Sequence, residues 1–442
     1  MAKPIVSIVR YEEPETSARR VVDLAGGLEH LPSNPKVFIK PNIVFWTKAV
    51  AFPKWGVITT SRVIEDIVIL LKENGVTDIT IGEGVVVSKP NDRETPAHAF
   101  KTLGYEAMGK KYGVKTVNVF DRPFESVDLG GGVELNFNAD ILNSDFVVDI
   151  PVLKTHNQTV VSLGIKNLKG TIDIKSRKKC HSVEPGKDLN YMVARLADRM
   201  PPMLTILDGI YTLERGPAFD GKVHRSNILA ASRDVLSADL VGSRILGVDP
   251  ADVPHLCHAA DNHNRPLDLS DVEVVGEAIE AVSFAHGYKF DYHDEEDGNM
   301  PVPLARDGIK GLFYRKYDLS MCTYCSGLNG LLLTAIRYAW KGEPWDNIEV
   351  LTGKAMQPTP GMKKTILVGK CMYQAHKDNS DIQEMIPIKG CPPEPQKALE
   401  ALQKAGIDAS PDLFAQVDKL PGFFMNKYAG KPEYDEAFFS VK

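Results

Sequence analysis

The sequence lacks most of the features that reveal a protein class at once. No apolar run is long enough to span a membrane, and residues 1–9 lack the extended apolar stretch and small-residue cleavage site of a secretory signal. The 442 residues contain only six cysteines. We therefore expect a cytoplasmic protein, where thiols stay reduced and a group of cysteines binds metal more often than it forms disulfides.

Basic excess and nucleotide-binding motifs are also missing. The formal net charge is -6, so nucleic acid is not an expected partner, because binding to phosphates draws on an excess of lysine and arginine. Neither G-x-G-x-x-G nor G-x-x-x-x-G-K-[ST] occurs, which weakens dinucleotide and P-loop interpretations. No internal repeat is found.

What the chain does contain is apolar material in alternating strand and helix patterns. Hydrophobic residues make up 43% of the sequence, and the length favours two or three domains. Residues 35–42 predict a strand, residues 60–75 an amphipathic helix, and residues 77–82, 145–153 and 203–209 further strands. This alternation is typical of an α/β fold with a mostly parallel sheet.

An acidic stretch at residues 291–297 divides the predicted domains, because clustered like charge packs poorly. We expect an α/β domain over residues 1–290, an acidic linker region over 291–315, and a smaller α/β domain with a C-terminal tail over 316–442. In that smaller domain, the patterns predict helices at 328–340 and 394–405 and strands at 348–352, 365–368 and 385–388. The aromatic residues of the tail predict that it packs back onto the protein.

Four of the six cysteines fall in this smaller domain, where strand ends and helix starts are predicted. Cys322 and Cys325 form a C-x-x-C pair before a helix, and Cys371 and Cys391 each follow a strand. Ligands in parallel sheets collect beyond the carboxyl ends of strands, and helix N-termini stabilise thiolates. The four cysteines therefore predict one metal site.

The same pattern bears on the choice of metal. Zinc ribbons use two C-x-x-C pairs, whereas this chain has one, and a Cys-Pro element such as Cys391-Pro392 recurs among iron–sulfur ligands. We expect a 4Fe-4S cluster, with structural zinc as the alternative and scattered buried cysteines as a third. Cys180 and Cys257 stand apart and are expected to be ordinary thiols.

Several motifs in the first 275 residues resemble the domain-of-unknown-function family 362. They are residues 38–42 (FIKPN), 81–84 (IGEG), 151–156 (PVLKTH), 164–170 (GIKNLKG), 208–209 (DG) with 216–217 (GP), and 232–234 (SRD) with Asp239. The resemblance covers roughly residues 36–275. It implies an α/β fold and an association with iron–sulfur modules. It does not imply one particular reaction, because the family has no single established activity. Many members look like they carry ferredoxin-type cysteine runs, from which the four dispersed cysteines here depart.

The motif residues also have a chemistry of their own. Ammonium groups that follow successive strands attract a carboxylate or phosphate, and a lysine whose pKa is depressed by like charges acts as an acid or base near neutral pH. Each residue alone has an ordinary structural explanation, such as a solvated lysine or a turn asparagine. Together they predict catalytic Lys154, His156 and Lys166, with substrate-binding Lys40, Asn42, Glu83, Thr155, Asn167, Lys169 and His181.

These two predicted sites lead to one functional hypothesis and three alternatives. We expect an iron–sulfur oxidoreductase that acts on a small anionic substrate held in a Lys/His-rich cleft, with the cluster near enough to exchange electrons with that substrate. The alternatives are an electron-transfer or cluster-carrier protein that meets a redox partner, a lyase that uses an open iron as a Lewis acid, and a zinc-stabilised ligand-binding protein.

Overall fold

The computed structural model describes residues 2–29, 31–87, 92–293 and 300–442. The chain forms two compact units. Unit 1 comprises residues 1–180, 190–289 and 421–442, and unit 2 comprises residues 181–189 and 290–420. Among the described residues, no helix combines the length and apolar character needed to cross a membrane.

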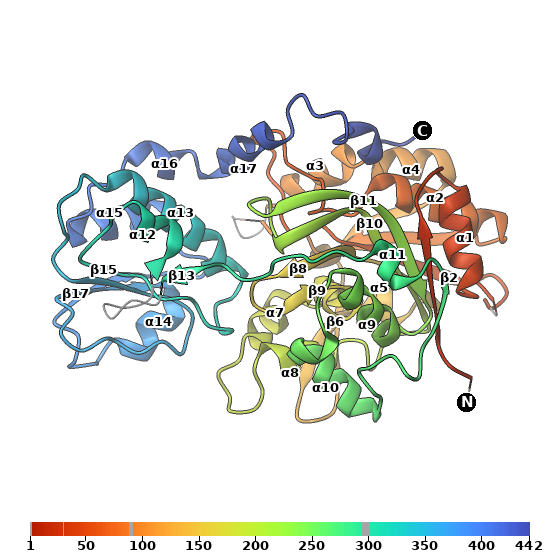
Figure 1. Cartoon of the computed structure of the whole chain (residues 1–442), viewed down its shortest axis with the longest axis horizontal. Helices are drawn as coiled ribbons and strands as arrows, with labels where there is room; N and C mark the ends of the chain where they lie inside the picture. Colours follow the sequence, from red (N-terminus) through yellow and green to blue (C-terminus); the bar gives the residue numbers. More distant parts are fainter. Residues whose placement is uncertain (1, 30, 88–91, 294–299) are drawn as a thin grey trace. The chain divides into compact units, whose positions relative to one another are not determined.

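The strands of unit 1 build a large mixed sheet and a separate hairpin (Figure 1). The sheet has the order β12-β1-β11-β10-β7-β2-β3-β4, and β8 and β9 extend it beside β10. Most neighbours are parallel; β11 runs antiparallel to β1 and β10, and β9 to β8. The strands are β1 (Ile5–Arg10), β2 (Lys36–Pro41), β3 (Asp78–Glu83), β4 (Lys115–Asn118), β5 (Phe124–Asp128), β6 (Glu134–Asn138), β7 (Phe146–Ile150), β8 (Val152–His156), β9 (Val160–Ser162), β10 (Met203–Gly216), β11 (Lys222–Ser232) and β12 (Glu273–Gly276).

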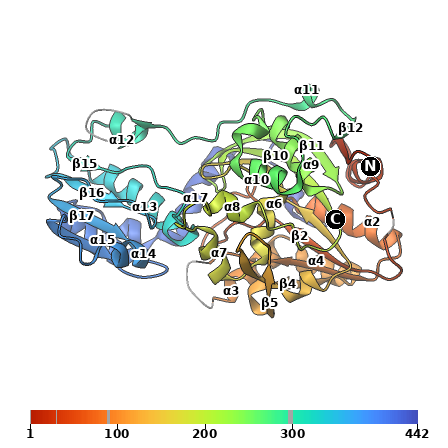
Figure 2. The ribbon, with the colours of Figure 1, turned by 90° about the horizontal axis from the view of Figure 1, so that it is seen from below.

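Helices cover both faces of this sheet, with α1 to α4 along one side and α9 and α10 along the other (Figures 1 and 2). Strand β10 is apolar on both faces, so helices can pack on each side of it. Its residues Leu204 and Ile206 belong to the core that α1 to α4 share, whereas Leu207 approaches Gly242 on α9. The helices of unit 1 are α1 (Thr16–Leu24), α2 (Ser61–Glu73), α3 (Glu94–Thr102), α4 (Tyr105–Tyr112), α5 (Ala139–Leu142), α6 (Gly164–Asn167), α7 (Ile174–Cys180), α9 (Val235–Ile245), α10 (Pro254–His263) and α11 (Ile279–Val282). Two further helices, α8 (Leu189–Val193) and α17 (Leu420–Phe423), lie at the boundary between the units, because each begins at the last residue of a unit 2 segment.

Unit 2 is built on a four-stranded sheet in the order β15-β16-β17-β18, in which every pairing is parallel. A short antiparallel pair, β13 (Tyr292–His293) with β14 (Met300–Pro301), precedes it. The sheet strands are β15 (Leu312–Phe313), β16 (Ile348–Leu351), β17 (Lys364–Val368) and β18 (Glu384–Ile388), and the helices are α12 (Val302–Arg306), α13 (Thr323–Ala339), α14 (Gly369–His376), α15 (Pro395–Ala405) and α16 (Pro411–Ala415).

The α/β class with a mostly parallel main sheet is confirmed, whereas the division of the chain differs from the predicted domains. Residues 421–442 group with unit 1, because the tail residues Tyr428 and Phe439 pack against Trp55 in that core. The described part of the segment predicted as a linker, residues 291–315, contains β13, β14, α12 and β15 and groups with unit 2. Residues 294–297 of the acidic stretch lie outside the described residues.

Candidate functional site

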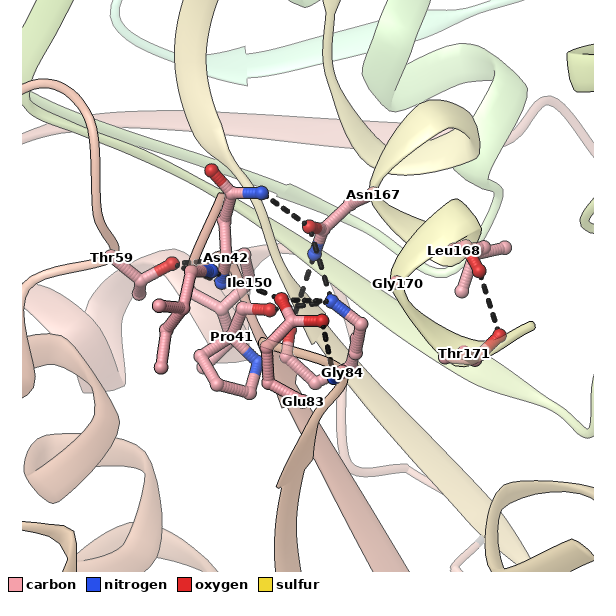
Figure 3. A network of polar contacts seen from close by, with 12 residues as sticks. Pro41, Asn42, Thr59, Glu83, Gly84, Ile150, Asn167, Leu168, Gly170 and Thr171 are labelled. Carbon is pink, nitrogen blue, oxygen red and sulfur yellow. Dashed lines mark hydrogen bonds and ion pairs between the residues drawn. The ribbon is translucent and has the colours of Figure 1, made fainter. Parts of the chain in front are cut away.

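A buried polar network lies where β2, β3 and β7 end side by side (Figure 3). The register pairs Lys40 on β2 with Asp149 on β7, and Glu83 is the last residue of β3. Three charged residues thus reach the carboxyl edge of neighbouring parallel strands, the position where ligands collect in this class of sheet. All three are buried, so the network must satisfy its charges internally.

Lys40 is fully enclosed, and its ammonium uses all three of its protons. It donates to Glu83 Oε2 at 2.8 Å, to the carbonyl of Pro41 at 2.6 Å and to Asn167 Oδ1 at 3.3 Å. Glu83 also accepts from the backbone N–H groups of Ile43 and Gly84, at 3.0 and 2.7 Å. A buried ion pair is tolerated when its remaining hydrogen-bonding capacity is filled in this way.

Asn167 is the centre of the network and connects β2, the loop after it, and β7. Its amide nitrogen donates to Asp149 Oδ1 at 2.8 Å and to the carbonyl of Lys40 at 3.3 Å. Its amide oxygen accepts from Lys40 and, at 2.9 Å, from the amide nitrogen of Asn42. Asn167 therefore fixes the positions of groups that are distant in sequence, and the side chains of Asn42 and Asn167 have orientations set by their partners.

Lys154 is the network's second buried lysine and has no carboxylate partner among the described residues. It donates to Asn42 Oδ1 at 2.6 Å and to the carbonyl of Val57 at 2.8 Å. Burial lowers the pKa of Lys154 to about 7; Glu83 opposes that shift and Lys40 adds to it. Like charge was predicted to lower the pKa of such a lysine, but burial is the larger cause.

In its neutral form, Lys154 has two N–H donors, which match its two acceptors and leave a lone pair. A lysine that titrates near neutral pH is suited to proton transfer.

Burial raises the pKa of two carboxyl groups, Asp149 inside the network and Asp239 near it. Burial raises the pKa of Asp149 well above its ordinary value, with Lys40 and Asn167 opposing the shift. Oxygen Oδ2 of Asp149 has no hydrogen-bond partner within the described residues. Burial also raises the pKa of Asp239 to about 7, although the backbone N–H groups of Gly164 and Ile165 donate to it.

Glycines at two motif positions allow the backbone to close over the ion pair. A Cβ at Gly170 would lie 2.3 Å from Glu83 Oε1 and 2.6 Å from Lys40 Nζ, and one at Gly84 would lie 2.7 Å from the carbonyl of Gly170. Such distances leave no room for a side chain, so the segments 164–170 and 81–84 meet through glycine. This close approach explains why both motifs carry glycine at these positions.

The structure brings together only part of the predicted residue set. Lys40, Asn42, Glu83, Lys154 and Asn167 form the hydrogen-bonded network described above. Lys166 lies near enough to Lys154 and Lys169 for the repulsion to lower its pKa, after burial as the larger cause.

The remaining predicted residues have other partners. Thr155 donates to the carbonyl of Gly287 at 2.7 Å and accepts from the N–H of Arg215, so it braces β10. His156 accepts from the N–H of Gln158 at 3.0 Å within its own turn. His181 belongs to unit 2, where its ring contacts the carbonyl of Leu319 at 2.8 Å. These hydrogen bonds connect the three residues to groups outside the network.

Asp149 is the network residue that the sequence analysis missed. A signal was present, since it is an acidic residue inside the apolar strand 146–150, directly before Ile150 and Pro151. A charge in a strand that is buried throughout indicates a paired or protonated group.

In unit 2, the four predicted cysteines gather near the ends of the sheet strands. Cys322 is the N-cap residue of α13, Cys325 lies in its first turn, and Cys391 follows β18. Strand β17 ends at Val368, as predicted, and Cys371 lies in the first turn of α14, which follows it. A Cβ at Gly369 would lie 2.8 Å from the Cys325 sulfur, so this turn passes directly over that thiol.

The other three cysteines all act on the Cys325 thiol. Hydrogen bonding with Cys325 lowers the pKa of Cys322 to about 5, with backbone N–H groups at the start of α13 adding to the shift and burial opposing it. The pKa of Cys325 is raised, first by Cys322, then by burial, and further by Cys371 and Cys391. The donor set therefore has the composition that zinc and iron–sulfur clusters use. Among the described residues, however, no three His, Cys, Asp or Glu side chains are already arranged to hold a metal ion.

The comparisons with known proteins agree with the motif analysis for unit 1. The family described as "Domain of unknown function (DUF362)" matches residues 37–244, the segment that holds the whole buried network. The match supports the predicted family over this segment and stops short of the expected residue 275. It does not extend to the four cysteines.

Two individual proteins are similar to the chain. "Thylakoid-associated protein sll1697" from Synechocystis sp. is 28% identical over 263 residues, which cover 56% of this chain and 76% of that protein. The lactate racemase apoprotein of Thermoanaerobacterium thermosaccharolyticum aligns over 96% of this chain and 82% of its own, with 12% identity and a TM-score of 0.32.

Proposed function

We propose that this protein is an iron–sulfur oxidoreductase that acts on a small anionic substrate. The observation that carries the proposal is the gathering of Cys322, Cys325, Cys371 and Cys391, in which the last two raise the pKa of the Cys325 thiol. Four cysteines within electrostatic range are the ligand set of a 4Fe-4S cluster. When bound, such a cluster supplies one-electron transfer.

The protein's own groups in unit 2 favour an anionic thiolate set. Cys322 is the N-cap residue of α13, a helix of 17 residues, and the backbone N–H groups of Tyr324 and Cys325 lower the pKa of its thiol. Lys354 adds positive charge near Cys322. The turn at Gly369 brings backbone against the Cys325 sulfur, and the N–H of Lys370 donates to the carbonyl of Gly390 at 2.9 Å. That bond holds together the two turns that carry Cys371 and Cys391.

Unit 1 supports the second half of the proposal with an acid–base group. Lys154 titrates near pH 7 and, when neutral, keeps both N–H groups bonded and one lone pair available. Lys40 and Glu83 form a closed ion pair beside it and hold the surrounding groups in place. A general base needs a pKa near the working pH and a fixed position, and Lys154 has both.

The decisive experiment is anaerobic purification followed by iron, sulfide and zinc analysis and an absorption spectrum. We expect brown protein with iron and sulfide near four per chain. Replacing Cys371→Ser should lower the iron content, whereas Cys257→Ser, which removes a cysteine outside the group, should leave it unchanged. Stoichiometric zinc without iron would contradict the proposal and favour the zinc-stabilised alternative.

A second measurement separates an enzyme from an electron carrier. The dithionite-reduced protein is mixed with a panel of small carboxylates and phosphates, and reoxidation is followed in the wild type and in Lys154→Ala. An oxidoreductase predicts reoxidation by particular compounds that Lys154→Ala abolishes while the iron content stays intact. Equal behaviour of both proteins would favour the carrier, and turnover without any redox change would favour the lyase.

A further inference from the structure

His255 is a fully buried histidine whose hydrogen-bonding capacity is unused. Its exposure is 0%, and neither Nδ1 nor Nε2 has a hydrogen-bond partner among the described residues. The backbone of Thr159 approaches the ring without completing a hydrogen bond. Burial lowers the pKa of His255 to about 3, so the ring is neutral at pH 7 and offers one donor and one acceptor. Unsatisfied polar groups of this kind are rare in folded proteins and call for an explanation.

Lys166 is the second group in this region that lacks a partner. Within the described part of the chain, no hydrogen bond or ion pair joins its ammonium to another residue, although the side chain is partly buried. Burial, and after it the charges of Lys169 and Lys154, lower the pKa of Lys166, and Lys166 lies close enough to His255 to disfavour a charged ring. Lys40 and Lys154, in contrast, have their protons directed to internal acceptors. Of these three lysines, only Lys166 offers an unpaired ammonium.

The surrounding elements hold the two residues in one corner of unit 1. Lys166 lies on α6 and His255 on α10, and both helices pack against α9, as Figure 2 shows. Asp239 on α9 accepts from the backbone N–H groups of Gly164 and Ile165, at 2.7 and 2.9 Å, which fixes α6 in place. The corner is therefore built by rigid elements, as a binding site requires.

The backbone beside His255 is also strained. Val160, which follows Thr159, has a φ of 66°, in the left-handed region that β-branched residues rarely adopt. Strain of this kind persists where surrounding structure enforces it and collects at ligand sites. It is a second local feature, independent of the unsatisfied ring, that marks this corner.

We infer that Lys166 and His255 together bind a small monocarboxylate, with the ammonium on one carboxylate oxygen and the imidazole N–H on the other. A carboxylate fits this pair because each of its two oxygens can accept a hydrogen bond from one of the two donors, and its single negative charge matches one ammonium. The inference rests on the anionic substrate of the proposed function and names its class and its binding groups. Binding itself requires no cluster.

The test uses the full-length protein and acetate as the probe. Thermal unfolding is followed with rising sodium acetate and, in parallel, with sodium chloride at equal ionic strength. We expect acetate to raise the Tm of the wild type in a saturable way, because a ligand that binds only the folded state stabilises it. Lys166→Met and His255→Phe should lose this rise. Lys175→Met, which removes an exposed lysine of α7, should keep it.

His255→Phe also separates binding from a purely structural role. Without acetate, the variant should be at least as stable as the wild type, since it replaces two unsatisfied polar atoms with apolar ones of similar shape. A less stable variant that keeps the acetate response would overturn the inference, as would a wild type that responds equally to acetate and chloride. If His255→Phe does not fold, the Tm response of Lys166→Met to acetate tests the inference by itself. If the protein contains iron but its Tm does not respond to acetate, only this inference is contradicted. If the protein contains no iron but binds acetate, only the proposed cluster is contradicted.

Discussion

The amide oxygen of Asn42 accepts a hydrogen bond from the Lys154 ammonium at 2.6 Å. The two residues are 112 positions apart in the chain and meet because β2 and β7 are neighbours in the sheet and β8 follows β7 directly. Asn42 in turn is held by Asn167. The nitrogen that titrates near neutral pH is therefore positioned by an amide pair that carries no charge of its own.

Lys154 should make stability depend on pH. Its pKa is lowered from 10.5 to about 7, so between these values the unfolded chain binds the proton and the folded chain does not. The free energy of unfolding should then rise with pH, by up to about 1.4 kcal/mol per pH unit from this group. We expect Lys154→Met to lack this rise in urea titrations from pH 7 to 10. Lys175→Met should behave like the wild type, and a wild-type minus Lys154→Met difference that is constant with pH would contradict the assignment.

Asn167→Ala should destabilise unit 1 strongly. The change leaves Asp149 Oδ1 and the donors of Asn42 and Lys40 without one partner each. We expect a loss of about 1–3 kcal/mol for each group left unsatisfied, measured by urea denaturation. Asn143→Ala is the matched control, because Asn143 is exposed, and it should change stability by less than about 0.5 kcal/mol. Equal effects of the two substitutions would show that the network contributes little.

Gly170→Ala should disturb the ion pair below it. The added methyl group would meet Glu83 at 2.3 Å and Lys40 at 2.6 Å, so the segment must shift. We expect a loss of about 1–3 kcal/mol, as for other overpacked sites, together with a changed pKa for Lys154. In Gly287→Ala the nearest atom to the new methyl group lies 3.6 Å away, so stability should stay close to that of the wild type.

The tail provides a direct comparison of two phenylalanines. Phe439 is 2% exposed and packs edge-on against Trp55, whereas Phe423 is 64% exposed. Phe439→Ala should lower the free energy of unfolding by about 3–5 kcal/mol, the range for a buried phenylalanine. Phe423→Ala should change it by less than about 0.5 kcal/mol. Similar losses for both would mean that the tail does not belong to the core of unit 1.

Periodicity and strand composition predicted the regular elements well. The helix expected over residues 60–75 is α2, whose residues Val63, Ile64, Ile67, Val68 and Leu71 are all buried. The strands at 77–82, 348–352 and 365–368 are β3, β16 and β17. Local patterns are enough to predict such elements, because the spacing of apolar residues indicates whether one face of a helix or a whole strand is buried.

Partners that are distant in sequence could not be predicted in this way. The predicted strand ends indicated that Lys40, Glu83 and Lys154 lie near one another. The acceptors that the two lysine ammonium groups use could not be predicted, because they depend on the order of the strands in the sheet. His181 stands one residue beyond Cys180, yet the fold assigns it to unit 2. His255 gave no signal at all, because a single histidine in an amphipathic helix looks the same whether its ring is satisfied or not.

The position of the tail determines how unit 1 can be produced by itself. Three separate stretches of the chain build that unit, and residues 421–442 are one of them. A fragment that stops at residue 289 would uncover Trp55 and Tyr211, the rings on which Tyr434 and Phe439 pack. Proteolysis between residues 290 and 420 should consequently leave a nicked complex that stays associated through these aromatic contacts until denaturant releases the final 22 residues as a peptide.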